Sequence, residues 1–152
     1  MFLITAGVRL TKVGTSEDDI AKIAQVFRDY FAVEWDVCNF KTRKLTRALF
    51  VSNTGLAFAI SDVLQNTDKI LLGSDENPRY LGLQNIFIKA NELNAASIIL
   101  GINALDSDLK KNERKIKLLE EFENKGLEFG VKVIDLLSLS QYNQKSLKAE
   151  IS

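Results

Sequence analysis

Hydrophobic and polar residues along this chain follow first a strand-like period, then a helical period, and then a strand-like period again. Residues 2–11 are mainly apolar and β-favouring, which predicts a strand. In the next segment Ser16 is placed to cap a helix, and Asp19 three residues later completes a capping-box pattern. The apolar residues that follow recur at helical spacing and predict one buried helix face, made of Ile20, Ile23, Ala24, Phe27 and Tyr30.

Strict alternation of apolar and polar residues begins at residue 32. In residues 32–38, one side of an extended chain would carry Val33, Trp35 and Val37. This pattern predicts a half-buried strand with Trp35 in the core rather than at a binding surface.

The middle of the chain predicts a hairpin, a short strand and a second helix. Residues 48–61 contain two β-favouring runs, separated by a turn that has Gly55 at its left-handed position. Residues 69–74 predict a short strand, followed by a turn and then a helix over residues 80–93. The inward face of that helix consists of Leu83, Ile86, Phe87 and Ala90.

The last third of the chain predicts a buried strand, a helix and a closing strand. Residues 95–101 are strongly apolar, as is typical of a central strand covered on both faces. Asn112 is a suitable N-cap for a helix over residues 113–125 that ends at Gly126. Its core stripe is Ile116, Leu119 and Phe122. Residues 131–139 then close the chain as a strand.

This order of elements predicts an α/β (α+β) fold, a mixed β-sheet flanked by helices, and residues 1–152 have the length of a single domain. The 20 basic and 20 acidic side chains cancel, so the overall field favours neither nucleic acid nor an anionic membrane. No apolar run reaches the roughly 18 residues of a membrane-spanning helix, and the first residues lack the pattern of a signal peptide. We therefore expect a cytoplasmic protein without membrane contact, in which the single cysteine, Cys38, is a structural thiol.

The most informative count is that of histidine, which is zero. This count excludes Ser-His-Asp and Cys-His catalysis, histidine acid–base chemistry and imidazole metal ligands. An enzyme with this sequence would need a displaced site, recognisable by a deep pocket and a carboxylate of raised pKa.

Three stretches together resemble the RadC-like branch of the JAB/MPN (JAMM) metalloprotease-type domains: IFIKANELNAASIIL, KIKLLEEFENKGLEFGVKVIDLLSLS and SLKAE. The order of elements is that of the family: a helix, an apolar strand, a loop, a helix closed by glycine and a final strand that carries Asp135. The likeness covers about residues 73–148. It implies a single JAB/MPN-like domain with a cytidine-deaminase-like, three-layer architecture.

The resemblance also implies where a zinc site would lie. Members of that family carry, after the apolar strand, the motif histidine, any residue, histidine, seven residues, serine, two residues, aspartate, which leaves one open position on zinc. Ile102 and Ala104 stand at the two histidine positions, and Lys115 stands at the aspartate position. Hydrocarbon has replaced both imidazoles, and an ammonium, which repels a cation, has replaced the carboxylate. The vestigial site consists of Ile102, Asn103, Ala104, Asp108, Asn112 and Lys115.

Charged residues around this loop leave two further interpretations open. Asp106 and Asp108 could hold Mg²⁺ through oxygen ligands, or they are solvated loop acids ahead of a helix. Lys115 either occupies the vacated cation position and pairs with a nearby acid, or it is an exposed helix lysine.

The basic segment KTRKLTR carries four cations, Lys41, Arg43, Lys44 and Arg47. They predict either contacts with a phosphate backbone or an acidic partner, or a solvated loop or edge strand protected against aggregation. The zero net charge favours the second interpretation, because it offers no wider basic face.

The resemblance implies a catalytically inactive domain without a cofactor or metal, which binds a protein partner or a second copy of itself as a scaffold. RadC-like proteins are often encoded on bacterial mobile elements and carry a DNA-repair label, which extends this hypothesis to mobile-element or phage–host conflict. The alternative is a nucleic-acid-binding module associated with DNA repair or recombination that uses the basic segment. Its affinity would fall steeply with rising salt.

Overall fold

The computed structural model of the chain describes residues 2–10, 16–37, 46–64, 78–103, 109–140 and 142–151. In chain order these residues form β1 (Phe2–Arg9), α1 (Glu17–Val37), β2 (Thr46–Val51), β3 (Leu56–Leu64), α3 (Pro78–Glu92), β4 (Ser97–Asn103), α4 (Glu113–Phe129), β5 (Lys132–Leu139), β6 (Gln144–Ser146) and α5 (Leu147–Ile151). The strand predicted at residues 69–74 lies outside the described residues.

The described strands form one six-stranded mixed sheet in the order β1-β3-β2-β4-β5-β6. The pair β4–β5 is parallel and the other neighbouring pairs are antiparallel. Ile98 of β4 is aligned with Phe50 of β2 on one side and with Val133 of β5 on the other. Every residue of β4 is buried, which confirms the predicted central strand.

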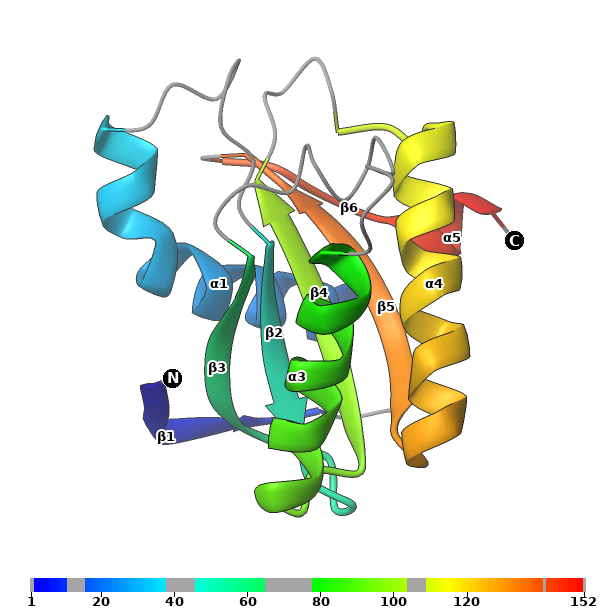
Figure 1. The fold of residues 1–152 in the computed structure, drawn as a ribbon. Helices are drawn as coiled ribbons and strands as arrows, with labels where there is room; N and C mark the ends of the chain where they lie inside the picture. Colours follow the sequence, from blue (N-terminus) through cyan, green and yellow to red (C-terminus); the bar gives the residue numbers. More distant parts are fainter. Residues whose placement is uncertain are drawn as a thin grey trace.

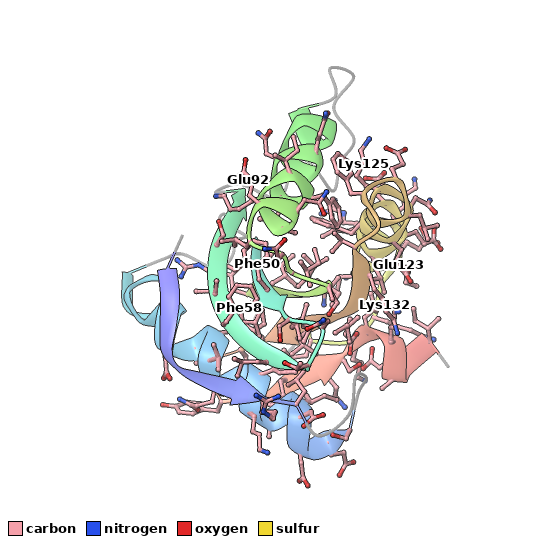
Figure 2. The ribbon with its side chains drawn as sticks, turned by 90° about the horizontal axis from the view of Figure 1, so that it is seen from below. Phe50, Phe58, Glu92, Glu123, Lys125 and Lys132 are labelled. Atoms are coloured by element: carbon pink, nitrogen blue, oxygen red, sulfur yellow. The ribbon has the colours of Figure 1, made fainter. Side chains whose placement is uncertain are left out.

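Helices cover both faces of this sheet (Figures 1 and 2). On one face, Phe50 packs in a core cluster with Phe87 of α3 and Phe122 of α4. On the other face, Ile99 packs in a second cluster with Phe27 of α1. The predicted α/β (α+β) class, a mixed sheet flanked by helices, is therefore confirmed. Among the helices that the structure describes, none is both long and apolar enough to cross a lipid bilayer.

The packing of α1 on the sheet depends on Gly101 in β4. A Cβ atom at Gly101 would lie 2.8 Å from the ring of Phe27, closer than real contacts of this kind. The glycine therefore allows the helix to approach the sheet closely, directly beneath the end of β4.

Two local predictions near the N-terminal half are confirmed by hydrogen bonds and dihedral angles. The backbone N–H of Asp19 donates to Ser16 Oγ at 3.2 Å, so Ser16 caps α1. Gly55 has φ of 86° in the turn between β2 and β3, as the hairpin pattern requires.

The strand predicted at residues 32–38 is wrong, because α1 continues to Val37. Trp35 follows Phe27 by eight residues, a spacing that also fits the helical period, and neither glycine nor proline interrupts residues 17–37. A short apolar alternation therefore could not distinguish a strand from the last turns of a long helix.

The predicted end of α4 at Gly126 is wrong, while the strand predicted at residues 131–139 is confirmed as β5 but is not the last element of the chain. The helix continues to Phe129 and ends at Gly130, which has φ of 69°, while the N–H of Val131 donates to the carbonyl of Gly126 at 2.9 Å. After β5 the chain adds β6 and the short helix α5. The carbonyl of Gly126 accepts the hydrogen bond that closes the helix, and Gly130 is the residue in the left-handed conformation. The sequence alone did not show which of the two glycines has which role.

Candidate functional site

The predicted vestigial site lies where β4 ends and α4 begins. Ile102 is 2% exposed and belongs to the apolar cluster between the sheet and α4. Asn103 is also buried, but neighbouring strand residues point to opposite faces, so it lies on the α1 side. One position of the predicted vestigial site therefore lies in the hydrophobic core.

Lys115, at the predicted aspartate position, is buried at the start of α4 with 4% exposure. Its backbone N–H donates to Oδ1 of Asn112, and its Nζ donates to the carbonyl of Lys110, both at 2.9 Å. Lys115 lies one helical turn before Leu118, which packs in the same cluster as Ile102, so the two site positions share one side of the sheet. The interpretation of Lys115 as an exposed lysine is wrong, and its pairing with an acid stays a prediction.

The residues that lead into α4 are also hydrogen-bonded to the C-terminal helix α5. The backbone N–H of Lys111 donates to the Glu150 carboxylate at 2.6 Å, and Lys111 Nζ donates to the Glu150 carbonyl at 3.3 Å. With the contact from Lys115 to Lys110, these bonds hold residues 110–112 between α4 and α5.

The predicted structural thiol Cys38 lies outside the described part of the chain, and so do these predicted site residues: Lys41, Arg43, Lys44, Ala104, Asp106 and Asp108. Of the basic segment, the structure describes Arg47, which is 6% exposed and aligned with Gly101 of β4. Because β2 lies between β3 and β4, Arg47 occupies neither a solvated loop nor an edge strand, which corrects both structural interpretations for this residue. The apolar run after Arg47 makes β2 an interior strand, and burial there removes its guanidinium from an exposed phosphate-binding patch.

A buried carboxylate that sequence reasoning left without a partner lies on β5. Ile98 is aligned with Val133 and Ile99 with Asp135, so Ile134 is an extra residue in the β4–β5 ladder. Such a bulge redirects side chains, and here it accompanies a carboxylate that reaches the neighbouring β6 and α5.

The Asp135 carboxylate accepts hydrogen bonds from the backbone N–H of Leu136 at 2.8 Å, the backbone N–H of Lys148 at 3.1 Å and the hydroxyl of Ser146. Burial raises the pKa of Asp135 above its ordinary value of 3.8, while the hydrogen bonds from Ser146, Lys148 and Leu136 act in the opposite direction. Asp135 is 2% exposed, so its own partners close it off from a substrate. A raised carboxyl pKa is present, but in an anchor for the C-terminal segment rather than in an open pocket.

The signal for Asp135 was its isolation as one acid within the apolar run VIDLLSL. An acid at a buried strand position requires hydrogen-bond donors, and this requirement was predictable from the sequence. Ser146 and Lys148 could not be identified as those donors without the hairpin that returns β6 to β5.

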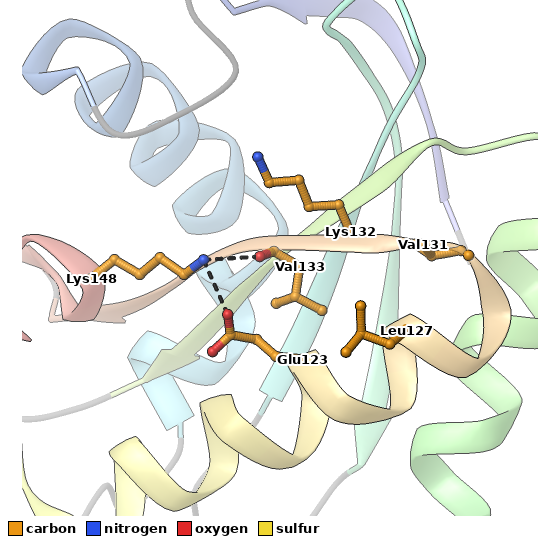
Figure 3. A pocket seen from close by; sticks show the side chains of 8 residues that line it. Glu123, Leu127, Val131, Lys132, Val133 and Lys148 are labelled. Carbon is orange, nitrogen blue, oxygen red and sulfur yellow. Dashed lines mark hydrogen bonds and ion pairs between the residues drawn. The ribbon is translucent and has the colours of Figure 1, made fainter.

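An open groove lies between α4 and the first residues of β5, and we call it the α4–β5 groove (Figure 3). It has a volume of about 370 Å³, and its side-chain lining includes Glu123, Leu127, Val131, Lys132, Val133 and Lys148. Lys148 Nζ bridges one end of the groove, 3.2 Å from the Glu123 carboxylate and 3.3 Å from the Val133 carbonyl. The groove was not predicted, because it is formed by elements that only the tertiary fold brings together.

No group of three or more acidic or cysteine side chains with metal-binding geometry occurs among the described residues. The chain matches no model of a known protein family, and no curated protein matches it either.

Proposed function

We propose that this chain is a binding domain without a metal centre, related in architecture to the RadC-like JAB/MPN domains, which acts by holding a protein partner. The composition supports this proposal, since a chain with zero histidines cannot supply the two imidazoles of the hydrolytic site.

The observation that carries the proposal is the environment of Lys115. The residue is 4% exposed, and its ammonium donates to the Lys110 carbonyl at 2.9 Å, at the position where the resemblance requires a zinc-binding carboxylate. A fixed positive charge there opposes a divalent cation, and burial strengthens that repulsion because the local dielectric is low. Ile102 completes the change by placing a hydrocarbon side chain where a ligand would stand.

A domain that has kept this scaffold without its chemistry retains surfaces that recognise other proteins, because fold and chemistry are separable. The partner is a protein of the host cell or of a competing mobile element, and the domain acts as a scaffold in mobile-element or phage–host conflict.

Elemental analysis of the purified full chain tests the proposal, together with an assay for cleavage of peptide and isopeptide bonds. The expected result is substoichiometric zinc and no cleavage above background. Zinc at one equivalent per chain, or cleavage that is lost on chelation, would overturn the proposal. Lys115→Asp serves as the matched variant, because it removes the opposing charge while leaving the two histidine positions unchanged.

A further inference from the structure

We propose that the α4–β5 groove binds an extended segment of a partner protein in which acidic and apolar residues alternate, added as a strand to the open edge of β5. This inference rests on the proposed binding function and names the surface and the chemistry of the partner.

Near its start, and among the residues that the structure describes, β5 pairs with no strand on the side away from β4. The strand β6 pairs with β5 from Leu137 to Leu139, while α5 reaches the middle of β5 through the contacts of Asp135. At the start of the strand the carbonyl of Val133 points outward and accepts a hydrogen bond from the ammonium of Lys148. A lysine at this position protects a free strand edge from uncontrolled pairing, and it can be displaced by a matching strand.

One side of the groove is apolar. Val131 and Val133 are 3% and 4% exposed and form its floor, while Leu127 at the rim is 81% exposed. Leu127 has the highest exposure of the large hydrophobic residues that the structure describes as exposed, and its side chain lies on the α4 side of β5 (Figure 3). An apolar side chain of the partner would cover Leu127 at this point and remove both surfaces from water.

The other side of the groove is positively charged. Lys132 extends to the opposite side of β5 from Leu127 and Glu123 (Figure 3), and it makes no ion pair within the described residues. Glu123 is already paired with Lys148, at side-chain exposures of 40% and 34%, so the lining has one uncompensated positive charge. Lys132 therefore complements a carboxylate on the face of the added strand that points away from α4.

Strand geometry combines these two sides into one pattern of residues. Successive side chains of an added strand point alternately to the two faces of the sheet, one toward Leu127 and the next toward Lys132. The pattern that fits is apolar, acidic, apolar, acidic, with a backbone N–H of the segment donating to the Val133 carbonyl in place of Lys148.

Selection of a phage-displayed library of short random peptides on the full chain tests the inference. The expected result is enrichment of alternating acidic and apolar peptides. Their affinity should fall at least about tenfold for Leu127→Asp and for Lys132→Glu. The matched controls Tyr142→Asp and Lys145→Glu, also at exposed positions, should leave the affinity unchanged. Unfolding curves of all four variants establish that the fold is intact.

A second measurement separates strand addition from simple surface contact. Single N-methylation along the best selected peptide should abolish binding at alternate backbone amides, because every second N–H faces the protein in an added strand. Equal tolerance at all amides would overturn the strand-addition geometry.

Three outcomes of the selection would overturn the inference. Peptides that bind Leu127→Asp and Lys132→Glu as well as the wild type would place the binding surface elsewhere, and the proposed binding function would stand. Failure to enrich any peptide would exclude a peptide segment as the occupant of the groove. A concentration-dependent dimer that Leu127→Asp abolishes would also exclude it, and would show that a second copy of the chain binds there. Failure of the proposed function itself is read separately, from the zinc content and the cleavage assay.

Discussion

The hydroxyl of Ser146 donates a hydrogen bond to the buried carboxylate of Asp135, so one side chain of β5 fixes the point at which β6 passes into α5. The same hydroxyl accepts the N–H of Ala149 at 3.1 Å and thereby caps the short helix. Lys148 of α5 bridges the α4–β5 groove, and Glu150 of α5 accepts a hydrogen bond from the N–H of Lys111. The groove and the segment before α4 therefore both depend on this anchor.

Asp135→Ala should therefore lower the free energy of unfolding by about 2 kcal/mol, because the buried hydroxyl of Ser146 and the N–H of Lys148 lose their acceptor. Urea denaturation of the two proteins measures this difference. Asp29→Ala is the control: Asp29 is exposed on α1, and its removal should change the value by less than about 0.5 kcal/mol. Equal losses for the two variants would contradict the role of Asp135 as an anchor.

The same carboxyl gives a pH dependence whose sign follows from its environment. Burial raises the pKa of Asp135 in the folded chain above 3.8, so between that value and the raised pKa the folded state binds more protons than the unfolded state. Through this window the carboxyl therefore lowers the stability as pH rises. Unfolding free energies of wild type and Asp135→Asn, measured from about pH 4 to about pH 7, should show the wild type losing stability relative to the variant. A difference in unfolding free energy that does not change with pH would contradict the raised pKa of Asp135. So would a wild type that gains stability relative to Asp135→Asn as pH rises.

Periodicity predicted those parts of the fold in which one period dominates a whole element. The stripe of α1, the apolar run of β4 and the cap at Asn112 each determine their element from local residues alone. The prediction for residues 32–38 failed because the spacing of their apolar residues fits a helix as well as a strand. The helix that begins at Glu17 contains no glycine or proline that would end it before Val37.

The residues of the candidate site were predictable only where they align with positions of the motif in the family that the sequence resembles. The register of the resemblance selected Ile102 and Lys115, which the structure places on one side of the sheet. The partners of Asp135 and the α4–β5 groove arise from a strand bulge and a returning hairpin, and no pattern along the chain encodes either.

The two glycines at the end of α4 should respond differently to alanine. A Cβ atom at Gly126 would lie 2.3 Å from the carbonyl oxygen of Val131, so Gly126→Ala must move the backbone and should cost about 3 kcal/mol. A Cβ atom at Gly130 meets nothing within 4 Å, so Gly130→Ala adds only the strain of a left-handed residue, about 1–2 kcal/mol. Thermal and urea unfolding measure both values. Gly130→Asn should cost less than Gly130→Ala because asparagine tolerates this conformation, and a reversed order of the two alanine variants would contradict the geometry.

Lys115→Met should lower the free energy of unfolding by about 1 kcal/mol, because methionine fills the buried space of the lysine stem but cannot donate to the Lys110 carbonyl. Lys117→Met, at an exposed position of the same helix, should leave the value unchanged and controls for the loss of one charge from α4. Proteolysis at residues 110–112 should also become faster in Lys115→Met alone, since this segment loses the hydrogen bond from Lys115 Nζ to the Lys110 carbonyl. An increase in stability would contradict the prediction and would mean that removing a charge from the interior outweighs the lost hydrogen bond.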